Sequence, residues 1–120
     1  MNLKIKDACK EIHDNSVAHG FWELENVPEK LLLAICELAE ATEAHRKGGN
    51  LDAMIDTFLE SDRSDLNFEK YIKDSFGDEL ADAVIRIFDL AEHMNIPLEF
   101  HIKIKHSYNL NRPYKHNKQY

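Results

Sequence analysis

The chain has 120 residues, of which 43% are hydrophobic, and we expect one domain over residues 1–120 that is large enough to bury a core. Its net charge of −7 argues against binding to a nucleic acid duplex, which needs clustered cations. The mean hydropathy of −0.51, with no apolar stretch near the ~20 residues that span a bilayer, argues against a membrane protein. The first residues, MNLKIKDACKEIHD, lack an apolar signal-peptide core, so we expect a cytoplasmic protein.

The spacing of apolar residues predicts an all-α fold with four main helices. The first covers about residues 3–19, and the second runs from about 28 to 47, where Gly48 and Gly49 end it. The third covers about residues 75–94, and the fourth begins at Pro97. Between the second and third, short helical pieces are predicted around residues 51–59 and 68–72, separated by the polar run SDRSDLN.

The two cysteines, Cys9 and Cys36, both fall on apolar faces of predicted helices. A disulfide is conceivable from their number alone. In a chain without an export signal, however, we expect two buried free thiols in a reducing cytoplasm.

Two acidic pairs stand inside nearly apolar helices. Glu37 and Glu40 form the first pair and Glu79 and Asp82 the second, each with a spacing of three residues that puts both carboxylates on one helix face. Carboxylates that face the inside of a bundle must be neutralised, paired or bound to a metal. Four of them suit Mg²⁺, with Mn²⁺ as a substitute, because such ions prefer oxygen ligands and keep waters for a phosphate-bearing substrate.

The two acidic pairs also have interpretations other than a Mg²⁺ site. A single acidic pair is usually solvated surface, but two pairs in apolar helices favour a site. A di-iron bundle needs Glu-x-x-His elements, and the sequence contains none. The second pair also begins a polar seam that continues through Arg86, Asp89 and His93, in which we expect a structural salt bridge between Arg86 and Asp89.

An E-x-x-E pair followed about forty residues later by E-x-x-D resembles the MazG-like all-α nucleoside triphosphate pyrophosphohydrolases. The segment HGFWELENVPEKLLLAICELAEATEAHRK resembles the family's first metal helix and its approach, and DELADAVIRIFDLAEHMNI resembles the second metal helix. The tail HIKIKHSYNLNRPYKHNKQY resembles the ending K-x-x-x-N-x-x-R-P, matched here by Lys105, Asn109, Arg112 and Pro113.

The resemblance implies a MazG-like bundle of four main helices that is completed by oligomerisation, as a homodimer or homotetramer. Two predicted helices that are apolar nearly all round support this, because one chain cannot easily cover both. The implied reaction is Mg²⁺-dependent cleavage of a canonical or modified nucleoside triphosphate, (d)NTP, at the α–β linkage, which gives the monophosphate and pyrophosphate.

The resemblance also assigns roles to individual residues. Glu37, Glu40, Glu79 and Asp82 are the expected metal ligands, and Glu40 is our candidate for activating the attacking water. Lys105, Asn109 and Arg112 are expected to hold the polyphosphate, although a solvated basic tail is the alternative. Trp22 is expected beside the base, with a core or interface anchor as a nearly equal alternative. His13 matches a base-side residue of some relatives, but we expect a surface histidine.

A second class of function stays open from the sequence. The chain is then a non-catalytic helical module that binds a nucleotide or a partner protein, with the acidic seam kept for structure. The complete set of four carboxylates favours the enzyme, because a binding module does not need all four.

Overall fold

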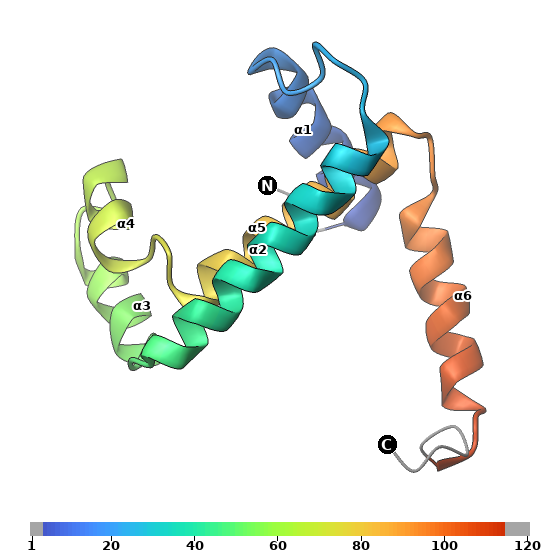
Figure 1. Ribbon diagram of the computed structural model, residues 1–120. Coiled ribbons are helices and arrows are strands. Elements are labelled where there is room, and N and C mark those ends of the chain that lie inside the picture. Colours follow the sequence, from blue (N-terminus) through green and yellow to red (C-terminus); the bar gives the residue numbers. More distant parts are fainter. Residues whose placement is uncertain (1–3, 115–120) are drawn as a thin grey trace. The chain divides into compact units, whose positions relative to one another are not determined.

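The computed structural model describes residues 4–114, which contain six α-helices and no strand (Figure 1). The all-α prediction is therefore confirmed for this part of the chain. The end of the quoted tail, residues 115–120, lies outside the described residues. The four main helices are α1 (Ile5–Ala18), α2 (Val27–Lys47), α5 (Phe76–His93) and α6 (Leu98–Leu110), and the two short ones are α3 (Leu51–Glu60) and α4 (Asp65–Tyr71).

Side-chain caps fix where the two carboxylate-bearing helices begin. The Asn26 side chain accepts a hydrogen bond from the backbone N–H of Glu29 at the start of α2, and Pro28 stands in the first turn. At the start of α5, the Ser75 hydroxyl accepts from the N–H of Asp78, three residues on. Helix α2 ends at Gly48, whose φ of 75° lies in the left-handed region that favours glycine.

The chain divides into two compact units, each described here by itself. The central unit, residues 24–87, holds α2, α3, α4 and the beginning of α5. Within it α3 packs against α4, and the rings of Phe58 and Phe68 meet edge to face. The terminal unit, described over residues 4–23 and 88–114, holds α1, the end of α5 and α6, with α1 packed against α6.

The buried apolar residues are small. Among the described residues they are Cys9 and four alanines: Ala8, Ala41, Ala83 and Ala91. Many large apolar side chains stay exposed, and in the central unit they gather on α2 and α5. These are Leu31, Leu32, Ile35, Leu38, Leu80, Val84, Ile85 and Ile87, which are 42–60% exposed. One copy of the chain thus leaves much of the apolar surface of these two helices in water.

The cysteine prediction holds for one thiol and is wrong for the other. Both cysteines are free, and Cys9 is buried on α1. Cys36 is exposed instead, because it lies on the same uncovered face of α2 as Leu32 and Ile35. Within residues 4–114, no helix combines the length and the apolar composition that a membrane crossing requires.

Candidate functional site

Three of the predicted carboxylates converge in the central unit. Glu37 and Glu40 come from consecutive turns of α2, and Glu79 comes from the first turn of α5. One oxygen of each lies within 4.8 Å of an oxygen of the others. Side chains so close repel one another when ionised, so the group is suited to a cation or to a retained proton.

Glu79 is the most constrained member of this group. It is 4% exposed, and its Oε2 atom has no hydrogen-bond partner. The pKa of Glu79 is raised to about 7, first by burial and then by the negative charge of Glu40, the hydrogen bond with Glu40 and the charge of Asp82. A buried carboxylate oxygen without a donor needs a proton or a metal ion, so these residues fit a divalent cation that prefers oxygen.

Asp82 lies three residues after Glu79 on the same face of α5, but it is outside the group of three. Its pKa is raised by burial first and then by the charges of Asp78 and Glu37, while Arg86 lowers it. Asp82 is therefore close enough to feel the cluster electrostatically. Its role as a fourth ligand stays a prediction.

A cavity of about 440 Å³ opens beside Glu40 and Glu79. Lys47 and Asp74 also line it, and both residues also line a neighbouring cavity of about 290 Å³, together with Lys70, Lys73 and the rings of His45, Tyr71 and Phe76. The sequence did not single out these cations, because isolated lysines on helix ends look like ordinary solvated surface.

The expected pairing of Arg86 with Asp89 is wrong. Arg86 reaches across to α2, where its Nε donates to Oε1 of Glu37 over 2.7 Å. The prediction considered residues on one helix alone, whereas the acidic cluster on the neighbouring helix offers Arg86 a more buried carboxylate.

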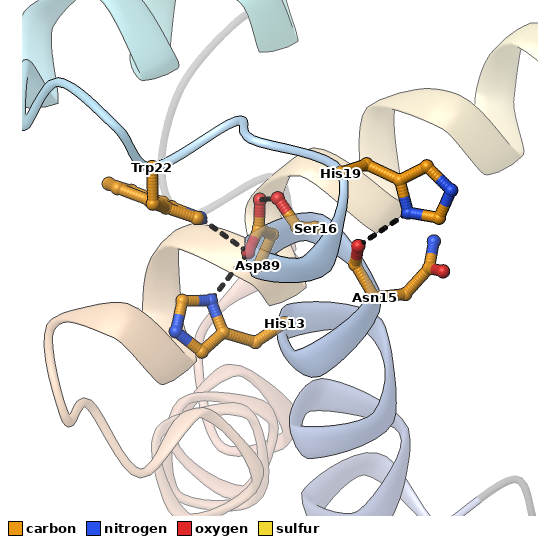
Figure 2. Close-up of polar contacts among 6 residues, drawn as sticks. All are labelled: His13, Asn15, Ser16, His19, Trp22 and Asp89. Atoms are coloured by element: carbon orange, nitrogen blue, oxygen red, sulfur yellow. Dashed lines mark hydrogen bonds and ion pairs between the residues drawn. The ribbon is translucent and has the colours of Figure 1, made fainter.

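Asp89 instead collects three polar partners within the terminal unit (Figure 2). His13 Nδ1 lies 2.7 Å and Trp22 Nε1 lies 2.9 Å from its Oδ1, and the Ser16 hydroxyl donates to its Oδ2 over 2.6 Å. The expectation of a surface histidine at position 13 is wrong, because the His13 side chain is 17% exposed and points at this carboxylate. The sequence around His13 gives no indication of this contact, because Asp89 lies 76 residues away.

Trp22 is half-buried and held on two sides. Its indole stacks on the imidazole of His93, with ring centroids 3.6 Å apart, while its N–H donates to Asp89. These contacts make Trp22 an anchor of the terminal unit. Its place beside a nucleobase stays a prediction.

The predicted phosphate-binding residues gather at the end of α6, also in the terminal unit. Lys105 Nζ lies 5.2 Å from the ring centroid of Tyr108, and the Arg112 guanidinium carbon lies 5.5 Å from it. Lys105 and Asn109 line a shallow cavity of about 420 Å³ with His101, Ile102 and His106. The sequence did not single out Tyr108, whose ring lies near both cations.

No protein-family model, curated protein or solved structure matched the chain. The functional conclusion therefore rests on the chain's own residues.

Proposed function

We propose that this chain is a Mg²⁺-dependent nucleoside triphosphate pyrophosphohydrolase of the MazG-like kind. Its reaction cleaves a (d)NTP or a modified nucleotide between the α- and β-phosphates. The proposal is carried by the buried Oε2 of Glu79, which has no hydrogen-bond partner, in a carboxylate group that lies close to those of Glu37 and Glu40. An oxygen-only set of this kind suits Mg²⁺ or Mn²⁺ better than a metal that prefers sulfur or imidazole.

The ligands in this proposal are Glu37, Glu40, Glu79 and Asp82. A bound divalent ion would screen the repulsion between the carboxylates and the polyphosphate and would polarise the phosphoryl oxygens. The chain's own part is to hold the carboxylates on two helices whose starts are fixed by caps, and three of them, Glu37, Glu40 and Glu79, lie close together.

Glu40 is the residue that we assign to the attacking water. Glu40 and Glu79 both line the 440 Å³ cavity, but the Glu40 side chain is exposed to solvent whereas Glu79 is buried. A carboxylate in contact with solvent can accept a hydrogen bond from water and take its proton as attack begins.

The remaining substrate contacts are proposed from the terminal unit. Lys105 and Arg112, which flank Tyr108, would pair with phosphate oxygens, and Asn109 would donate to them. Trp22 would contribute its indole ring to stacking with the base. We further propose that the exposed apolar faces of α2 and α5 are covered by a second copy, as a homodimer or homotetramer.

The test is pyrophosphate release from a panel of canonical and modified nucleoside triphosphates, with and without Mg²⁺. A pyrophosphohydrolase releases pyrophosphate and the monophosphate in equal amounts, and only when the ion is present. A non-catalytic module binds a nucleotide without turnover, so binding with no release across the panel would reject the enzymatic proposal.

A further inference from the structure

Arg86 contacts Glu37, one of the proposed metal ligands, but is not a ligand itself. Nε of Arg86 donates to Oε1 of Glu37 over 2.7 Å, and the two side chains are 32% and 12% exposed. The other described arginine–carboxylate contact of the central unit, between Arg46 and Glu43, joins side chains that are 71% and 59% exposed. The pair between Arg86 and Glu37 is therefore much less exposed to solvent than the surface pair between Arg46 and Glu43.

The place of Arg86 on α5 explains how it reaches the cluster. It follows Glu79 by seven residues and Asp82 by four, so all three side chains share one helix face. Arg86 lies two turns after Glu79 on α5, and its partner Glu37 lies one turn before Glu40 on α2. The arginine therefore borders the carboxylate group without standing inside it.

We infer that Arg86 is a positioning residue for the metal site, an inference that rests on the proposed function. Its hydrogen bond takes one oxygen of Glu37 and leaves the other for an ion. Glu37 has three rotatable side-chain bonds, and the bond to Arg86 selects among their rotamers before any ion arrives. Residues that hydrogen-bond a ligating carboxylate orient it in this way.

The sign of the effect on metal affinity distinguishes positioning from a simple counter-charge. By Coulomb's law alone, removing a cation beside the site makes a divalent ion bind more tightly. Removing a residue that orients a ligand makes the ion bind more weakly, by about 10- to 100-fold for partners of this type. The two roles thus predict opposite changes.

The experiment measures Mn²⁺ binding to the full chain without nucleotide, from the loss of the paramagnetic resonance signal of the free ion. Arg86→Met removes the charge and the hydrogen bond but keeps the length of the stem, and Arg86→Lys keeps the charge but loses Nε. The control is Arg46→Met, which breaks the exposed pair with Glu43. We expect the dissociation constant to rise from wild type to Arg86→Lys to Arg86→Met, by at least about tenfold for the last. Arg46→Met should match wild type.

Other outcomes overturn the inference in distinguishable ways. If Arg86→Met binds Mn²⁺ as tightly as wild type or more tightly, Arg86 is a counter-charge and the inference is wrong, while the proposed function stands. If wild type itself does not bind Mn²⁺, the metal site and the inference fail together. Circular dichroism checks folding, and if Arg86→Met is unfolded, Arg86→Lys decides, because a pure counter-charge role predicts wild-type affinity for it.

Discussion

The indole of Trp22 lies nearly parallel to the imidazole of His93, with 8° between the ring planes. The same indole donates its N–H to Asp89, which also contacts His13 and Ser16. One half-buried carboxylate therefore ties α1 and the residues after it to the end of α5. A nucleobase therefore cannot stack on the face of Trp22 that His93 covers.

Asp89→Ala should destabilise the protein strongly. It removes the acceptor of three hydrogen bonds at a half-buried site, and one bond to a charged group is worth about 1.5–3 kcal/mol. We expect the free energy of unfolding from urea titration to fall by at least that amount. The matched control is Asp14→Ala, whose carboxylate pairs with Lys10 at the exposed surface of α1 and should change little. Equal effects of the two substitutions would mean that the Asp89 contacts do not stabilise the fold.

The raised pKa of Glu79 predicts a pH dependence of stability in metal chelator. Its pKa is about 7 when folded and 4.5 ordinarily, so between these values the folded state holds a proton that the unfolded state has released. Stability should therefore fall as the pH rises from about 4.5 to 7 and then level off. We expect a lower melting temperature at pH 7.5 than at pH 5, and Glu79→Gln should reduce this difference. If Glu79→Gln has the same melting temperature as wild type at both pH values, the predicted role of Glu79 is wrong.

Substitution of the carboxylates should separate turnover from folding. Glu37→Gln and Asp82→Asn keep the side-chain shape but remove a ligand charge, so pyrophosphate release in Mg²⁺ should be abolished while the helical circular dichroism is unchanged. Without metal, Asp82→Asn should not lower stability, because the charges of Asp78 and Glu37 crowd this carboxylate. For Asp82 the test is especially informative, since it lies outside the group of three. Wild-type turnover by Asp82→Asn would remove it from the ligand set.

Arg112→Ala and Trp22→Ala should act on different ends of the nucleotide. Losing Arg112 should lower kcat/KM for every nucleotide by a similar factor, because the triphosphate is common to all and a charge-assisted bond is worth about 1.5–3 kcal/mol. Losing Trp22 should change the ranking among bases, since stacking contributes about 1–3 kcal/mol per base. The measurement is kcat/KM for several nucleotides on each folded variant.

A control and a contrary result sharpen that comparison. Lys103→Ala, on the same helix as Lys105 but in contact with Glu99, should leave kcat/KM unchanged. If Arg112→Ala reorders the bases and Trp22→Ala slows all nucleotides alike, the two ends of the substrate are reversed.

Self-association should be visible in sedimentation. The exposed apolar faces of α2 and α5 predict a dimer or tetramer at micromolar concentration, without a stable folded monomer on dilution. Ile35→Glu places a charge on this surface and should shift the chain toward smaller or unfolded species. Wild type sedimenting as a compact folded monomer would contradict the prediction.

Local patterns predicted the helices well and the contacts between them poorly. Apolar spacing and stop signals such as Gly48 placed the main helices, because these signals act within a few residues. Helical spacing put Glu37 and Glu40 on one face, but the partner of Arg86 depended on which helix lies beside α5, and that is decided by packing. The links from His13 and Trp22 to Asp89 join residues 76 and 67 positions apart, a range that no local pattern reports.

The exposed thiol of Cys36 can report how accessible the apolar face of α2 is to solvent. Cys9 is buried and its pKa is raised, mainly by burial, so it is a poor nucleophile toward alkylating reagents. Cys36 alone is left to react, and it lies on the apolar face of α2 among Leu32 and Ile35. A second copy or another partner that binds this face shields the Cys36 sulfur from the reagent. The alkylation rate of Cys36 therefore measures the fraction of time for which the face is covered.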